Sequence, residues 1–251
     1  MSWSSFWAFF RLDMKIVMRD RMAMGMLLLV PAGFYIFFGA FFGNISSPES
    51  AARYYNQYTV SFAAVILLSA ALLNLGPMIV ISKDMGFYRR LMVTPLKMSE
   101  VWLASICRIL VIATVGYVEV LAVGYVLFDM LPQASLLQLA VPALVSAFML
   151  LSMGFLLGAL FNKPQTAFNA GMVIFQPMLL LSGAGFPREM FPDWASDVAV
   201  CIPFTHAIDI MRMGWAGSYF TSGAVVPTAA LLASGAVCAL MATYTFRKRA
   251  V

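Results

Sequence analysis

Six long apolar runs recur along the chain, and short polar segments separate them. Each run approaches the roughly 20 residues that a helix needs to cross the hydrocarbon core of a bilayer. The pattern therefore predicts six membrane-spanning helices. The runs cover residues 22–43, 58–81, 104–128, 135–161, 166–184 and 224–246.

Residues 3–21 have the pattern of a helix that lies on a membrane surface. On a helical projection, their apolar side chains fall within an arc of about 100° and their basic side chains within a second, narrow arc. Asp13 and Asp20 lie apart from the basic stripe, so the alternative is a simple cytoplasmic extension of the first span. The apolar arc holds Phe6, Trp7, Phe10, Met14 and Val17, and the basic arc holds Arg11, Lys15 and Arg19.

Residues 185–223 form the longest stretch that is not predicted to span the membrane. The stretch is rich in aromatic and aliphatic side chains, which are unfavourable in a solvated loop. We therefore expect short helices that re-enter the outer leaflet and are broken at Pro187, Pro192 and Pro203. Residues 1–251 then form one all-α integral membrane domain, with an interfacial helix at 3–21, spans one to five at 22–184, the re-entrant segment at 185–223 and span six at 224–246.

Basic residues are concentrated in alternate segments between the runs, with 13 of the 16 on one side of the predicted membrane. Only Arg53, Arg188 and Arg212 fall on the other side. The positive-inside rule then predicts that both termini are cytoplasmic. The cytoplasmic set is Arg11, Lys15, Arg19, Arg21, Lys83, Arg89, Arg90, Lys97, Arg108, Lys163, Arg247, Lys248 and Arg249.

Composition supports a membrane protein. Charged residues make up 11% of the chain and apolar residues 62%, whereas soluble domains carry roughly 25% and 45–50%. A net charge of +5 in a soluble protein would suggest a nucleic-acid partner. Here the basic residues flank the spans, where anionic lipid contributes about 1 kcal/mol for each Lys or Arg. We therefore expect contact with membrane lipid and no nucleic-acid partner.

The chain offers little for catalysis or metal binding. Cys107, Cys201 and Cys238 lie far apart, and His206 is the single histidine. These donors predict neither a metal centre nor a disulfide framework. The sequence has no Gly-x-x-x-x-Gly-Lys-Ser/Thr phosphate loop, so we expect no ATP hydrolysis by this chain.

Polar side chains inside the predicted spans are candidates for function. Glu119 is the one carboxylate well inside a span, where it could bind a cationic substrate, relay a proton or pair with a neighbouring helix. Asn74, Asn169 and Gln176 also lie at membrane depth, as interhelical hydrogen-bonding residues or as substrate contacts.

Two further patterns lie near the membrane segments. His206, Asp209 and Arg212 follow one another at i+3 spacing and predict a salt-bridge ladder on one helix face, with a catalytic or proton-relay pair as the less favoured alternative. Gly154 and Gly158 have a small-residue spacing that allows close helix approach.

Two segments together resemble the membrane subunits of small type-2 ABC exporters (ABC-2 permeases). Residues 84–97, Asp-Met-Gly-Phe-Tyr-Arg-Arg-Leu-Met-Val-Thr-Pro-Leu-Lys, look like the family's cytoplasmic coupling segment. Residues 181–187, Leu-Ser-Gly-Ala-Gly-Phe-Pro, are similar to its signature between spans five and six. They are followed, as in that signature, by Pro192-Asp193-Trp194 and by the stretch from Pro203 to Arg212.

The resemblance implies a non-catalytic subunit of an ATP-driven exporter in a bacterial or archaeal inner membrane. Two permease chains, identical or paralogous, would pair with two separate cytoplasmic ATPase subunits that bind ATP and Mg. The implied substrate is an amphipathic drug, lipid or glycolipid. The implied sites are the coupling residues Gly86, Arg89, Arg90, Thr94 and Pro95, the outer signature residues Gly183, Phe186, Pro187, Pro203, Thr205 and Arg212, and a substrate path with Asn74, Glu119, Asn169 and Gln176 as candidates.

Two other classes remain open. A proton-coupled carrier would use Glu119 and need neither ATP nor a partner, although no internal repeat supports it. A membrane enzyme that modifies lipid would have to use His206 with Asp209. Copurification with an ATPase would separate the exporter from both.

Overall fold

The computed structural model describes residues 3–43, 48–87, 98–128, 134–184, 188 and 191–249. Every regular element in these ranges is a helix, which confirms the all-α prediction. The elements are α1 (Trp3–Arg19), α2 (Arg21–Gly43), α3 (Pro48–Ser69), η1 (Ala70–Leu75), α4 (Gly76–Asp84), α6 (Met98–Phe128), α7 (Leu136–Leu160), α8 (Pro164–Leu181), α9 (Asp193–Cys201), α10 (Pro203–Trp215), η3 (Ser222–Ala224) and α11 (Val225–Arg249).

Four helical stretches are long and apolar enough to cross a membrane. They coincide with the predicted second, third, fourth and sixth spans. α2 and α8 occupy the places of the predicted first and fifth spans but are not among these four, so the six-span count stays a prediction. The four stretches are Tyr58–Asp84, Glu100–Val126, Leu136–Leu160 and Ser222–Phe246.

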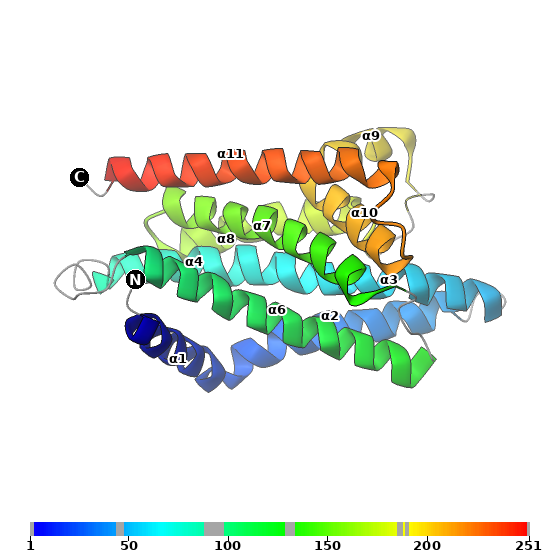
Figure 1. Ribbon diagram of the computed structural model, residues 1–251, viewed down its shortest axis with the longest axis horizontal. Helices are drawn as coiled ribbons and strands as arrows, with labels where there is room; N and C mark the ends of the chain where they lie inside the picture. The colour runs from blue at the N-terminus through cyan, green and yellow to red at the C-terminus, as the bar shows by residue number, and fades with distance from the viewer. Residues whose placement is uncertain are drawn as a thin grey trace.

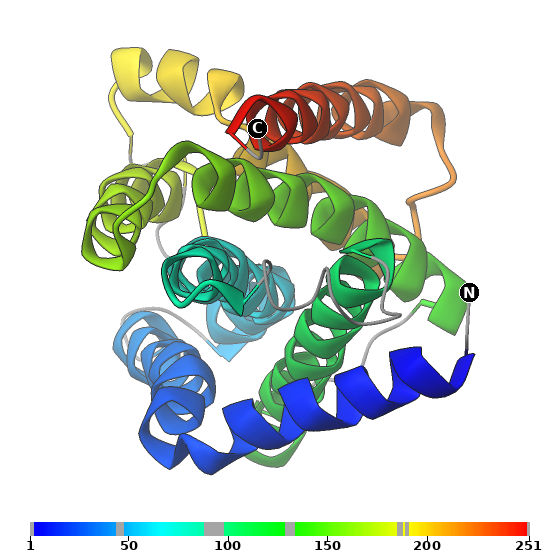
Figure 2. The same ribbon diagram turned by 90° about the vertical axis from the view of Figure 1, so that its left-hand side faces the viewer.

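The centre of the bundle is the continuous stretch α3, η1 and α4. α2, α6, α7 and α8 surround it when the bundle is viewed along its length (Figure 2). The hydrophobic window of Tyr58–Asp84 is 72% buried, against 28% for Glu100–Val126 and 22% for Ser222–Phe246. A movement of this central stretch would therefore also displace the helices that surround it.

η1 is a π-helical segment in the middle of that stretch, and it ends next to Gly76 and Pro77. Proline has no backbone N–H and disturbs the preceding helical turn, so a local change in helix type re-satisfies the freed carbonyls. In the structure the π-helical segment lies directly before Gly76 and Pro77.

Glycines allow α7 and α8 to approach this central stretch closely. A Cβ on Gly154 would lie 2.4 Å from the Ala71 carbonyl oxygen, and one on Gly158 would lie 2.8 Å from the Ile79 Cβ. On α8, a Cβ on Gly171 would lie 2.8 Å from the Leu72 carbonyl oxygen. The Gly154-x-x-x-Gly158 spacing therefore serves helix packing within one chain.

The start of α1 and the end of α11 lie at the same end of the bundle, and α9 and α10 lie toward the opposite end (Figure 1). α9 follows Pro192 and α10 begins at Pro203, so the two predicted helix breaks among the described residues are confirmed. Pro187 lies outside the described residues.

The helix α1 confirms the predicted helix at the start of the chain and crosses the bundle obliquely (Figure 2). Its buried face differs in part from the predicted apolar arc. Phe6 and Val17 are buried as expected, but Trp7 is 41% exposed and the charged residue Asp13 is only 6% exposed. Burial of Asp13 indicates a specific partner, because an unpaired buried charge is unfavourable.

Candidate functional site

The predicted coupling segment begins at the end of α4. Gly86 has a φ of +64°, a left-handed conformation that glycine adopts without strain, so it turns the chain away from the helix. Arg89, Arg90, Thr94 and Pro95 lie outside the described residues. Their coupling role stays a prediction.

Lys83 ties the end of α4 to two other helices. Its ammonium group donates to the carbonyl oxygens of Gly158 and Ala159 at the end of α7. The same nitrogen lies 4.3 Å from the ring centroid of Phe246 in α11, within the range of a cation–π contact. Lys83 therefore holds the end of α4 against α7 and α11.

A cavity of about 660 Å³ lies between α1, η1, α4, α6 and α8. Its walls include Asn74, the one predicted path residue that lines it. The Asn74 Oδ1 atom is buried and has no hydrogen-bond partner among the described residues. An unsatisfied amide oxygen in a membrane protein is unfavourable, so it needs an explanation.

A buried ion pair forms one wall of this cavity. Arg108 Nε on α6 lies 3.0 Å from Asp13 Oδ2 on α1, and the side chains are 1% and 7% exposed. Ser105 donates a hydrogen bond of 3.5 Å to the same carboxylate oxygen, and Arg108 Nη1 lies 3.0 Å from the Met78 sulfur. Burial raises the pKa of the Asp13 carboxyl, and the charge of Arg108 and the bond from Ser105 partly oppose that rise. The pair thus fixes α1 against α6.

Asn169 and Gln176 lie on the exposed side of α8, apart from Asn74 in the cavity. Gln165 Nε2 donates to Asn169 Oδ1 at 3.1 Å. At 100° per residue, Gln165, Asn169 and Gln176 fall within about 40° of one another. The three amides therefore lie on one exposed helix face, and Gln165 also lines the cavity.

Glu119 lies on α6 and does not line the cavity. Its Oε2 atom is buried without a hydrogen-bond partner among the described residues. A structural pairing within the chain is therefore not seen for this oxygen, and the functional reading of Glu119 stays open to test.

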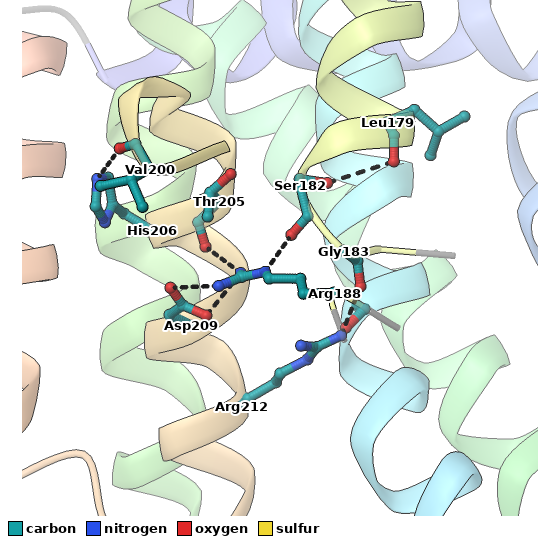
Figure 3. A network of polar contacts seen from close by, with 10 residues as sticks. Leu179, Ser182, Gly183, Arg188, Val200, Thr205, His206, Asp209 and Arg212 are labelled. Carbon is teal, nitrogen blue, oxygen red and sulfur yellow. Dashed lines mark hydrogen bonds and ion pairs between the residues drawn. The ribbon is translucent and has the colours of Figure 1, made fainter. Parts of the chain in front are cut away.

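Three of the outer signature residues, Gly183, Thr205 and Arg212, meet in a network around Arg188 (Figure 3). Arg188 forms two hydrogen bonds to the carboxylate of Asp209, at 2.8 and 3.3 Å. It also donates to the Ser182 carbonyl oxygen at 3.1 Å and to that of Thr205 at 3.4 Å. Arg188 thereby joins the end of α8 to α10.

Arg212 makes a second link between these elements. Its Nη2 donates to the Gly183 carbonyl oxygen at 2.7 Å, and its Nε donates to Ser61 Oγ of α3 at 3.0 Å. Its guanidinium also lies 4.9 Å from the ring centroid of Tyr58. Gly183 has a φ of +82°, and a Cβ there would lie 2.7 Å from Arg188 Nε, so only glycine fits.

The predicted ladder of His206, Asp209 and Arg212 is wrong. Asp209 faces Arg188, Arg212 turns toward α3, and His206 Nε2 contacts the Val200 carbonyl oxygen at 3.0 Å. Contacts with other elements thus replace the contacts that the i+3 spacing on one helix would allow. The His206 and Asp209 side chains have different partners.

The signature residues Pro203 and Thr205 lie in the first turn of α10. Pro203 occupies the first turn of α10, where its missing N–H is not needed. Thr205 is buried, and its hydroxyl has no partner among the described residues. Phe186 and Pro187 lie outside the described residues.

Sequence reasoning missed Asp13, Arg108, Arg188 and Ser61 as contact residues. Arg108 counted only toward membrane orientation, although a lone arginine within an apolar run is a sign of a buried partner. Asp13 carried the matching sign, since it lies off the basic stripe of α1. No local pattern could have paired Arg188 with Asp209.

This chain is similar to known membrane transport proteins. The family model described as "ABC-2 type transporter" matches residues 4–215. The chain is 28% identical over 151 residues to the probable multidrug ABC transporter permease YbhR of Escherichia coli K12, an alignment that covers 58% of this chain and 41% of that protein. It is 24% identical over 195 residues to the putative transport permease YvfS of Bacillus subtilis 168, covering 77% and 78%. The matched part is therefore less than half the length of YbhR.

Proposed function

Because this chain belongs to the ABC-2 type transporter family, and so is a multi-pass membrane transporter subunit, we propose that it is the permease of an ATP-driven exporter. Two permease chains, identical or paralogous, pair with two cytoplasmic ATPase subunits. ATP and Mg are bound by those partners. The permease supplies the path, and the ATPase supplies the energy.

The amide face of α8 is the observation that carries this proposal. Gln165, Asn169 and Gln176 are exposed on one face of the helix. Amides that face lipid are unfavourable, because lipid offers no hydrogen-bonding partners. A second permease chain, or substrate and water between the two chains, would satisfy them. The path therefore runs along α8 and the central stretch at the interface of two copies.

The end of α4 is the proposed input for ATP-driven movement. The segment after Gly86, with Arg89, Arg90, Thr94 and Pro95, docks in a groove of the ATPase. Lys83 connects the same end of α4 to α7 and α11. A push on the docked segment would therefore move several helices together.

The proposed orientation has both termini in the cytoplasm, six spans including α2 and α8, and α9 and α10 re-entering the outer leaflet. Two observations support it: the segregation of basic residues, and the positions of the termini and of α10 toward opposite ends of the bundle (Figure 1). The proposed substrate is an amphipathic drug or lipid, and the similarity to YbhR, a probable multidrug ABC transporter permease, supports a drug.

Cysteine crosslinking tests the interface. In a background without Cys107, Cys201 and Cys238, we expect Gln176→Cys to crosslink two copies in the membrane when the ATPase is coexpressed. The matched control is Val237→Cys, on the exposed side of α11, which should not crosslink. Crosslinking of Val237→Cys alone would place the interface elsewhere, and failure to copurify with any ATPase would refute the exporter.

A further inference from the structure

The 660 Å³ cavity under α1 has the size of a small-molecule site, since such sites measure about 300–1,000 Å³. It lies between α1 on one side and η1 and α4 on the other, with residues of α6 and α8 completing its wall.

Most of the cavity wall is apolar. α1 contributes Phe9, Leu12 and Ile16, α4 contributes Ile81, and α8 contributes Phe168. Leu12 and Ile16 are more than half exposed, at 53% and 52%, and Ile81 is 39% exposed. These side chains are available to cover the apolar body of a ligand.

Two oxygen acceptors in the wall lack a donor. The contacts of the Asp13 carboxylate with Arg108 and Ser105 both reach Oδ2, and Oδ1 has no partner among the described residues. Asn74 Oδ1 has none either. Because Arg108 balances the charge of Asp13, the cavity is close to neutral, and these two oxygens are hydrogen-bond acceptors.

We propose that this cavity binds a small amphipathic amine, with its N–H groups donating to Asn74 and Asp13 and its apolar body against α1, α4 and α8. A ligand with only acceptor groups would leave both oxygens unsatisfied, and a carboxylate would be repelled by them. In the exporter this cavity would be the site that a substrate occupies before export, and that role rests on the proposed function. Binding itself does not require the ATPase.

Binding to the purified chain in nanodiscs of phosphatidylglycerol and phosphatidylcholine tests the assignment. Fluorescence anisotropy compares rhodamine 6G, which carries secondary amine N–H donors, with rhodamine B, which lacks N–H donors and bears a carboxylate. We expect saturable binding of rhodamine 6G with one molecule per chain, and binding of rhodamine B weaker by about tenfold or more. Equal affinity for the two dyes would overturn the assignment.

Three variants test the location. Asn74→Leu should weaken rhodamine 6G binding about tenfold, because it removes one of the two acceptors. Ile81→Trp should abolish binding by filling the cavity. Leu103→Trp is the matched control, because Leu103 is equally exposed at 40% and does not line the cavity. Unchanged binding in Ile81→Trp with loss in Leu103→Trp would refute the location.

The lipid composition separates a free amine from an amine lipid. Adding phosphatidylethanolamine to the nanodiscs should leave rhodamine 6G binding unchanged. If it removes that binding, the occupant is a lipid and the assignment to a small amine is wrong. Binding without ATP-driven transport would refute the exporter and leave the cavity assignment intact. ATP-driven transport by a chain that binds no rhodamine 6G would refute the cavity assignment and leave the exporter intact.

Discussion

The Asp13–Arg108 ion pair offers a sharp test of how α1 is held to the bundle. The side chains are 7% and 1% exposed, and their charged atoms are 3.0 Å apart. Removing one partner of such a pair leaves a buried charge and costs about 3–5 kcal/mol. For a chain of this size each kcal/mol shifts Tm by about 2–4 °C, so Asp13→Ala should lower Tm by about 6–20 °C.

The two halves of the pair should not be equivalent. In Asp13→Ala the Arg108 guanidinium stays charged, since arginine does not lose its proton in proteins. In Arg108→Met, burial keeps the pKa of Asp13 raised and no guanidinium lowers it, so the carboxyl can take up a proton instead. Because the folded state then binds more protons than the unfolded state, stability falls as pH rises between the two pKa values. Lowering the pH should therefore restore stability to Arg108→Met and not to Asp13→Ala.

Thermal unfolding in detergent, followed by size-exclusion fluorescence, measures these effects. The double variant Asp13→Leu with Arg108→Met should unfold near the Tm of the unaltered protein, because an apolar replacement of both partners is often neutral. Asp209→Ala is the comparison, since Asp209 and Arg188 are each 30% exposed and the loss should be smaller. A Tm of Asp13→Ala equal to that of the unaltered protein, or a double variant as unstable as the single ones, would contradict this role of the ion pair.

Three further predictions address transport and packing. Glu119→Gln should insert and assemble with the ATPase normally but alter export in membrane vesicles; export kinetics that stay unchanged across pH would assign Glu119 to helix pairing alone. Replacing Arg89 and Arg90 together by Glu should leave insertion intact, because other basic residues set orientation, and should abolish substrate-stimulated ATP hydrolysis; a normal ATPase rate would contradict the coupling role. Gly154→Leu should destabilise the protein by about 1–3 kcal/mol through overpacking against η1, whereas Gly33→Leu, where a Cβ meets nothing within 4 Å, should leave Tm within a degree or two; equal effects would argue against the close packing.

The long helices could be predicted from the sequence because a membrane-spanning helix satisfies its own backbone hydrogen bonds, so an apolar run defines it locally. The breaks at Pro192 and Pro203 followed from the same local chemistry. The distribution of Lys and Arg likewise needs no knowledge of packing.

The polar contacts could not be predicted in the same way, because they join segments distant in the chain. Asp209 could reach Arg212 along one helix or Arg188 across the network, and only the positions of α8 and α10 decide between them. The sequence gives a weak indication of the Asp13–Arg108 pair. Asp13 lies off the basic stripe of an amphipathic helix, and Arg108 lies within an apolar run. The cavity that they line depends on how five elements pack, which no single segment encodes.

Reconstituted transport tests the central claim most directly. The purified chain is placed in proteoliposomes alone or with its ATPase, and movement of rhodamine 6G across the membrane is followed with and without ATP and Mg. We expect transport only when the ATPase, ATP and Mg are all present, and we expect it to be lost in the Arg89→Glu, Arg90→Glu variant. Transport by the chain alone, driven by a proton gradient and lost in Glu119→Gln, would contradict the proposed ATP-driven export.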